Sequence, residues 1–303
     1  MDAIVRSSGL GSEEELIARI AVVTDSTADL APGAAAAAGI RVVPLFVRFG
    51  ADELRVGVDI TTEQFWARML APGAPFPATA APSPGTFQAT FEACFAEGAE
   101  AVICPTIGSK LSATFQSATL AAQALPDRQI HVIDTGSTSM STGIPALLAV
   151  EMAAAGASGA EIAARVRDRL PDVDLYVAVD TLDYLRKGGR LSPARAAIGT
   201  LLSVKPIITV IDGLVVMAER PRTRARARER VVELITAAPI ERIAFLHTST
   251  STPDEIRAFC DRVLARIPGG VDPDRISAGL IGASTGPHLG PDLMGAAFLR
   301  RRT

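Results

Sequence analysis

The apolar positions in the first half of the chain form short runs, and longer amphipathic segments separate these runs. The runs favour β-strands over residues 21–24, 41–49, 101–107 and 130–135. Helix-start signals stand between them, such as the capping box of Thr61 and Gln64 and the Ser83-Pro84 pair. This alternation of strands and helices predicts a parallel sheet with helices on both faces.

The second half follows a different pattern. Capping boxes at Ser158 and Thr252 predict two amphipathic helices, and β-rich runs flank Asp212-Gly213, a dipeptide typical of hairpins. Strands are expected over residues 175–182, over both arms of the hairpin at 203–219, over 240–249 and, as the last strand of the chain, over 276–284. Together these elements predict an α+β domain with a mainly antiparallel sheet.

The predicted fold class is therefore α/β with two domains, which suits a chain of 303 residues. The expected division is an N-terminal domain over residues 19–157 and a C-terminal domain over residues 158–303. Residues 1–18 are expected to be a loosely attached leader, because they hold an early acid and lack the apolar core of a secretory signal.

Charge and cysteine usage argue against several classes of function. A formal net charge of −3 argues against nucleic-acid binding driven by bulk charge. The three cysteines are scattered without a CxxC pair, which argues against a zinc ribbon or a disulfide framework and is typical of a reducing cytoplasm. The chain has no Walker A or GxGxxG motif, and its three histidines lack metal-ligand spacing, so no cofactor and no metal are expected.

Three clusters of small hydroxyl residues follow predicted strands, at residues 25–30, 108–118 and 136–143. Ligands of parallel sheets lie beyond the carboxyl ends of the strands. The cluster at 108–118 also precedes a predicted helix, whose first backbone N–H groups and partial positive charge favour an anion. Since no glycine-rich phosphate motif is present, the expected ligand is a small anion such as a carboxylate.

Three residues in such loops are candidates for binding, and each has a plain structural alternative. Ser112 could contact a ligand or cap the following helix, and no GxSxG elbow marks it as a nucleophile. Thr79 lies between prolines that could stiffen a binding loop, although an ordinary linker is the simpler interpretation. His288 stands in a loop rich in glycine and proline that could aim its ring at a ligand or leave it in solvent.

Two basic segments could bind phosphate or an acidic partner. Arg186, Lys187 and Arg190 surround two glycines, and alternate arginines, Arg222 among them, run through residues 220–230. The simpler interpretations are a basic surface turn for the first segment and a solvated helix paired with glutamates for the second.

Taken together, these motifs resemble those of the DegV family, the bacterial fatty-acid-binding proteins. Each segment alone is a weak signal, whereas eight in family order over almost the whole chain are specific. The resemblance implies a two-domain protein that holds a fatty acid between its domains. The matching segments are TDSTADL (24–30), VVPLFVRFG (42–50), the TxxPSPGxF loop (79–87), SKLSATFQSA (109–118), IDT (133–135), DTLDYLRKGGRLS (180–192), SVKPIITVIDG (203–213) and HxGPxxxG (288–295).

The resemblance also implies roles for individual residues. The carboxylate-binding residues of the family fall on Thr79, Ser112 and His288, and a protonated His288 would add a charge-assisted hydrogen bond. The family role is to present the fatty acid to a separate fatty acid kinase, which forms an acyl phosphate for phospholipid synthesis, so the carrier itself is not expected to be an enzyme. Arg190 and Arg222 would face the kinase or the phosphate. A cytoplasmic location is implied, and a transient membrane contact for lipid exchange is compatible with it.

The chain departs from the family pattern around the expected head-group site. Asp292 stands where the family has a glycine, and if it faced the site its charge would oppose a carboxylate. Two alternatives therefore stay open: an acyl hydrolase that uses Ser112 or Ser109 as nucleophile, and a carrier for a different apolar acid. The other departures are Ala80 and Ala81 for a serine and a glutamine, Ala113 for a glycine and Leu289 for a threonine.

Overall fold

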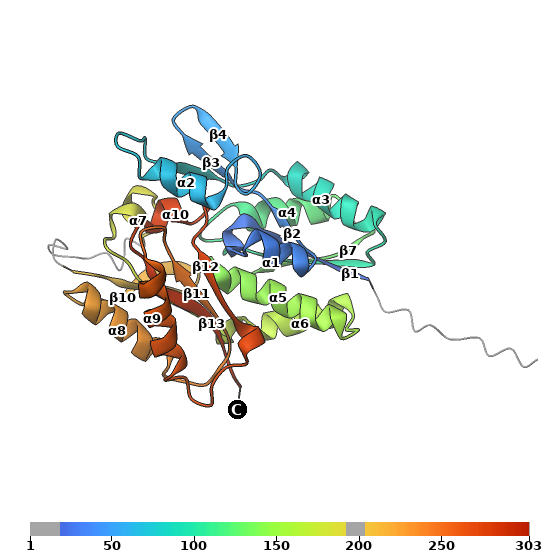
Figure 1. Ribbon diagram of the computed structural model, residues 1–303. Coiled ribbons are helices and arrows are strands. Elements are labelled where there is room, and N and C mark those ends of the chain that lie inside the picture. The colour runs from blue at the N-terminus through green and yellow to red at the C-terminus, as the bar shows by residue number, and fades with distance from the viewer. Residues whose placement is uncertain (1–18, 192–203, 303) are drawn as a thin grey trace, which may run out of the picture.

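The computed structural model describes residues 19–191 and 204–302, and two main sheets lie side by side in it (Figure 1). The first sheet has four strands in the order β2-β1-β6-β7, and all neighbouring pairs are parallel. The parallel sheet predicted for the first half is therefore confirmed. Its strands are β1 (Ile20–Asp25), β2 (Ile40–Val43), β6 (Ala101–Thr106) and β7 (Gln129–Asp134).

Helices cover both faces of this first sheet. On one face, α3 (Pro84–Ala96) and α4 (Thr114–Gln123) bury apolar side chains such as Phe87 against Val102. On the other face, α5 (Met140–Ala154) and α6 (Gly159–Arg169) pack on the strands. The short helix α1 (Pro32–Ala37) joins β1 to β2.

By its packing, α6 belongs to the first sheet. Ile162 and Val166 of this helix join the apolar cluster that contains Val22 and Ile103. Helix α6 therefore packs with the first sheet, and the division of the chain into domains between residues 157 and 158 stays a prediction. Gly156 and Gly159, which suggested the boundary, lie where α5 passes into α6. The expected leader, residues 1–18, lies outside the described residues.

The second sheet has six strands in the order β10-β9-β8-β13-β11-β12. Every pair is antiparallel except β11-β12, so the mainly antiparallel sheet is confirmed. Helices α8 (Arg224–Ile235) and α9 (Pro253–Leu264) cover one face through residues such as Val231 and Phe259. The strands are β8 (Val173–Ala178), β9 (Ile207–Ile211), β10 (Leu214–Glu219), β11 (Ile240–His247), β12 (Ile276–Leu280) and β13 (Met294–Arg300).

The sequence did not predict β13, although this strand lies inside the second sheet between β8 and β11. The last predicted strand, at 276–284, corresponds to β12, which ends at Leu280. The run that forms β13 contains Gly295, Ala296 and Ala297 in succession, and these small residues weaken a strand signal. The packing explains one of them, because a Cβ built on Gly295 would lie 2.1 Å from the carbonyl oxygen of Tyr176 on the neighbouring strand.

A small third sheet and one helix cover the junction between the two halves. Its strands β3 (Phe46–Phe49), β4 (Asp52–Arg55) and β5 (Ala78–Ala80) are antiparallel, and α2 (Thr62–Met69) packs beside them. The β-rich run over residues 41–49 thus contributes to two strands, β2 and β3, in different sheets. Trp66 of α2 donates a hydrogen bond from Nε1 to the backbone oxygen of Ile281 at 2.8 Å, which ties this cap to the second half.

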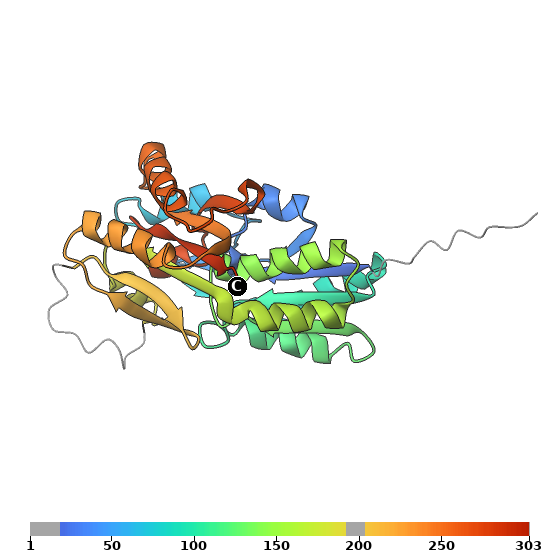
Figure 2. The same ribbon diagram turned by 90° about the horizontal axis from the view of Figure 1, so that it is seen from below.

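A network of ion pairs, here called the ionic seam, joins α5, α6 and the turn that follows α6 to residues of the second half. The C-terminal end of the chain lies at this junction (Figure 2). Arg169 is its most buried member, with a side chain that is 6% exposed. The pairs of the seam are Arg169 with Asp172 and Glu241, Arg275 with Glu241 and Glu151, Arg242 with Glu151, and Arg302 with Asp168 and Asp172.

Within residues 19–191 and 204–302, no helix is both long and apolar enough to cross a membrane.

Candidate ligand site between the two halves

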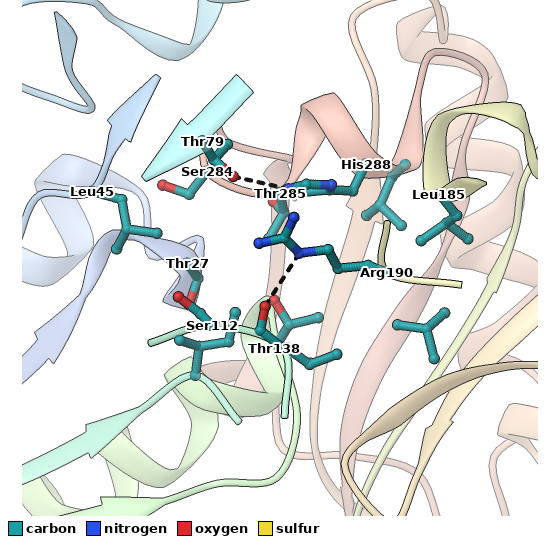
Figure 3. A pocket seen from close by; sticks show the side chains of 14 residues that line it. Thr27, Leu45, Thr79, Ser112, Thr138, Leu185, Arg190, Ser284, Thr285 and His288 are labelled. Carbon is teal, nitrogen blue, oxygen red and sulfur yellow. Dashed lines mark hydrogen bonds between the residues drawn. The ribbon is translucent and has the colours of Figure 1, made fainter. Parts of the chain in front are cut away.

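A small cavity lies where the carboxyl ends of the first sheet meet the second sheet and the cap (Figure 3). Its volume is about 50 Å³, and both apolar and hydroxyl side chains line it. The carboxyl ends of parallel strands are the expected place for a ligand. The lining residues of the first half are Thr27, Leu45, Thr79, Ile107, Leu111, Ser112 and Thr138, and those of the second half are Leu185, Arg190, Val215, Ser284, Thr285, His288 and Leu289.

The fold brings Thr79, Ser112 and His288 to this one cavity from distant parts of the chain. Thr79 does not lie in a linker: it is the central residue of β5 and pairs with Val47 of β3. His288 lies on the short helix α10 (Gly286–Leu289). The Oγ1 atom of Thr79 is 3.0 Å from Nε2 of His288, so a hydrogen bond crosses the junction (Figure 3).

Ser112 precedes α4 without being its N-cap. The N-cap is Ala113, which offers no side-chain hydrogen bond. Ser112 Oγ lies 2.8 Å from Thr114 Oγ1 and accepts a hydrogen bond from the Thr114 backbone N–H at 3.3 Å. The hydroxyl therefore stands at the start of α4, where the helix end favours a negative charge.

The ring of His288 is neutral at pH 7 in this structure. Burial lowers its pKa to about 4, and the nearby cation of Arg190 acts in the same direction. The Nδ1 atom is buried and has no hydrogen-bond partner. Since a buried N–H without an acceptor is costly, we assign the single proton to Nε2. His288 then donates to Thr79, and the Thr79 hydroxyl proton is free to point into the cavity.

Gly188 makes room for this ring. It follows α7 (Asp183–Lys187), and a Cβ built on it would lie 2.1 Å from Nδ1 of His288. In the sequence, the Gly188-Gly189 pair indicates a turn with unusual backbone angles. The structure gives Gly188 a further role, because any side chain there would displace the histidine.

Arg190 lines the cavity, whereas Arg222 does not. The Nε atom of Arg190 donates to the backbone oxygen of Leu111 at 3.3 Å, and Nη1 donates to that of Gly188 at 2.6 Å. Arg190 is an exposed residue, and its side chain lies near the middle of Figure 3. Arg222 is exposed in the connection between β10 and α8. The structure therefore brings only Arg190 of the two into the site.

Two cavity threonines that sequence reasoning did not single out are held by aspartates behind the cavity wall. Thr27 Oγ1 donates to Asp25 at 2.5 Å, and Thr285 Oγ1 donates to Asp29 at 3.0 Å. Burial raises the pKa of both carboxyls, that of Asp29 to about 6. Since these hydroxyl protons point at the aspartates, Thr27 and Thr285 present oxygen lone pairs to the cavity.

Thr27 lay in a hydroxyl cluster that the sequence had marked as a strand end. The sequence did not indicate Thr285 and Ser284 as site residues, because the last predicted strand extends to residue 284. In the structure, Ser284 Oγ lies 2.8 Å from Ser26 Oγ, which in turn accepts from the backbone N–H of Leu45 at 2.8 Å. These bonds join the two halves beside the cavity.

Asp292 does not line the cavity. Its backbone φ is +63°, in the left-handed region, which accounts for a glycine at this position in the family pattern. Its carboxylate pairs with Arg224 at 3.3 Å, and its backbone N–H donates to Thr250. The negative charge is thus held by an arginine outside the cavity. No group of three or more histidine, cysteine or acidic side chains arranged to hold a metal occurs in the described part of the chain.

Comparisons with known proteins show the family to which the chain is related. The model of the DegV family, described as an uncharacterised protein family, matches residues 19–301. A DegV domain-containing protein of Streptomyces coelicolor is 35% identical over 286 residues, which cover 93% of this chain and 99% of that protein.

Solved structures show the same similarity. A DegV family protein from Thermus thermophilus, described by its fatty acid binding, superimposes with a TM-score of 0.83 at 33% identity and covers 93% of this chain and 100% of its own. DegV of Bacillus subtilis, described as a fatty acid binding protein, gives 0.82 at 30% identity with coverages of 94% and 100%. The chain belongs to the DegV family.

Proposed function

We propose that this protein binds a long-chain fatty acid, with the carboxylate in the cavity between the two halves. The observation that carries the proposal is the convergence of Thr79, Ser112 and His288 on one cavity that also has apolar walls. The fatty acid binding described for the relatives from Thermus thermophilus and Bacillus subtilis supports it. A protein from Eubacterium ventriosum described as binding stearic acid, with a TM-score of 0.81 at 26% identity, supports it as well.

The donors for a carboxylate are Thr79, Ser112 and Arg190. Thr79 can donate because His288 supplies the other hydrogen bond of its hydroxyl, so His288 acts on the ligand through Thr79. A bound carboxylate near the ring would raise the pKa of His288, because an opposite charge favours the protonated form. The site then takes up a proton as it binds, at a pH between the free and bound pKa values.

Burial of the acyl chain dominates the expected affinity. At about 0.8 kcal/mol per methylene, a chain of roughly 14 methylenes gains on the order of 11 kcal/mol before the costs of ordering. The cavity of about 50 Å³ is too small for such a chain, since pockets for ligands of this size usually measure about 300–1,000 Å³. The tail therefore has to displace apolar side chains such as Leu185, Val215 and Leu289, which line the cavity.

We further propose that the protein presents this carboxylate to a separate fatty acid kinase for acyl phosphate formation. Arg190, an exposed residue that lines the cavity, is our candidate to contact a phosphoryl group, and exposed Arg222 is a candidate for the partner surface. The protein itself acts as a carrier in this scheme. No observation favours the hydrolase alternative: Ser112 pairs with Thr114 and His288 pairs with Thr79, so the two do not form a nucleophile–base pair.

Mass spectrometry of lipid extracted from freshly purified protein tests the proposal. A fatty acid in a one-to-one ratio supports it and reports the chain length. A protein that is empty, and stays empty after incubation with mixed fatty acids, overturns it. The same preparation is assayed with an acyl ester: turnover by the protein alone would establish the hydrolase alternative instead.

A further inference from the structure

A second, larger groove lies on the other side of Asp29 from the cavity. Its volume is about 460 Å³, within the range of ligand pockets. It is formed by the terminal strands of the two main sheets, β2 and β12, together with α1 and the start of α2 (Figure 1). Fatty-acid binding as proposed above makes no use of this groove.

One wall of the groove is the open edge of β12. The backbone N–H of Ile281 donates to the backbone oxygen of His247 in β11, so the backbone groups of Ile281 face β11. Since the direction of the backbone N–H and C=O groups alternates along a strand, those of Ala278, Leu280 and Gly282 face away from β11. The N–H of Gly282 is taken by Asp29 Oδ1 at 3.0 Å. Among the described residues, nothing pairs with the outward backbone groups of Ala278 and Leu280, and both residues line the groove.

This edge lacks the usual protection. Exposed edge strands are commonly blocked by lysine, proline or a bulge, whereas β12 reads ISAGL and pairs with β11 in regular register. Across the groove, Val42 and Val58 are 39% and 59% exposed, which is high for large apolar side chains. An unblocked edge beside apolar side chains is the arrangement that accepts an added strand.

The charge of the groove selects the kind of strand. Among the lining residues of the described chain, the ionisable ones are all acids and none is basic. Asp29 is partly buried and Asp25 is buried. Glu63 is exposed at the rim, and its side chain has no hydrogen bond or ion pair among the described residues. We propose that the groove binds an extended segment of a protein partner, with alternating apolar and basic side chains, which pairs with β12 through Ala278 and Leu280.

A fluorescein-labelled hexapeptide of alternating valine and lysine is the probe, and fluorescence anisotropy is the readout. The peptide is expected to bind saturably, and a peptide of alternating valine and glutamate about tenfold more weakly, since one charge contact of 1.4 kcal/mol corresponds to tenfold. Ala278→Pro removes one outward N–H and is expected to weaken binding by about tenfold. Ala278→Val is the matched control, because it keeps the amide, and should stay within about twofold of the parent.

The proposal is overturned if the valine–lysine peptide does not saturate below 1 mM, or if Ala278→Pro binds it as well as Ala278→Val does. It is also overturned if a fatty acid competes for the peptide, because the peptide would then occupy the cavity. Should Ala278→Pro fail to fold, Glu63→Lys takes its place. This reversal is expected to shift the preference toward the valine–glutamate peptide, and an unchanged preference contradicts the proposal.

Discussion

The two halves of the protein are joined in two regions that use opposite chemistry. At the ionic seam, arginines pair with carboxylates, and most members are partly exposed. Beside the cavity, neutral donors surround one carboxylate: Asp29 accepts from Ser139 at 2.6 Å, from Thr285 at 3.0 Å and from the N–H of Gly282 at 3.0 Å. We call this second region the hydroxyl joint.

The two regions use different side chains because ion pairs and neutral hydrogen bonds respond differently to burial and to salt. A seam of full charges is strong only where a member is buried, and salt weakens its exposed members. A site for a carboxylate has to keep neutral donors oriented, which hydroxyls achieve at little electrostatic cost. The comparison teaches that the seam holds the halves together, whereas the hydroxyl joint sets the chemistry of the cavity.

The largest expected effect comes from breaking the seam at its buried arginine. Arg169→Ala removes the partner of Asp172 and Glu241 and is expected to lower the free energy of unfolding by about 3 kcal/mol. Urea denaturation measures this change. Arg165→Ala, which removes an exposed pair with Asp168, is the control and should cost less than about 1 kcal/mol. Equal effects for both variants would show that the seam has no buried centre.

The hydroxyl joint and the cavity should respond to pH in opposite directions. The pKa of Asp29 is about 6 when folded and 3.8 as a model value, so the folded state holds the extra proton and stability falls as pH rises from 4 to 6. The pKa of His288 is about 4 when folded and 6.5 as a model value, so the unfolded state holds the extra proton and stability falls as pH drops from 6.5 to 4. Each effect reaches at most about 3 kcal/mol.

Variants separate these two opposing slopes. Relative to the parent, Asp29→Asn should gain stability as pH rises through 6, and His288→Gln should gain stability as pH falls below 6.5. The parent curve should be flatter than either, because the two contributions cancel within one window. Urea denaturation at pH 4.5, 5.5 and 7 measures this, and parallel curves for all three proteins would contradict the assigned pKa directions.

A smaller effect is expected from closing the space beside His288. Gly188→Ala places a methyl group against the ring, so Thr79 loses its hydrogen-bond partner. Fatty-acid affinity is expected to fall by about tenfold, the equivalent of one hydrogen bond of 1.4 kcal/mol. Isothermal titration calorimetry measures the affinity. Gly33→Ala is the control, because a Cβ there meets nothing within 4 Å, and it should leave the affinity unchanged.

The smallest effect on affinity is expected for Ser112→Ala. The acyl chain supplies most of the binding energy, so affinity should fall by no more than about threefold, whereas phosphorylation by a fatty acid kinase should fall by about tenfold or more. Ser109→Ala serves as control, since this exposed serine does not line the cavity. Equal losses in the binding and kinase assays would refute this division between tail and head group.

Local features were predictable because they depend on neighbours in the chain. The capping boxes of Thr61, Ser158 and Thr252 are all present, and Asp212-Gly213 forms the expected hairpin turn, with φ values of +53° and +74°. Caps and turns are satisfied within four residues, so the sequence contains all the information they need. The parallel sheet followed in the same way from the alternation of strands and helices.

The sequence by itself determined the two kinds of sheet, the helix starts and, through the resemblance, the family. Only the tertiary structure decided that Thr79 lies in a strand opposite His288, 209 positions along the chain, that Asp292 faces Arg224, and that β13 enters the second sheet. It also decided that the His288 ring is neutral. The physical reason is that pairing across sheets, burial and the pKa shifts that burial causes depend on contacts between distant segments, which no local pattern encodes.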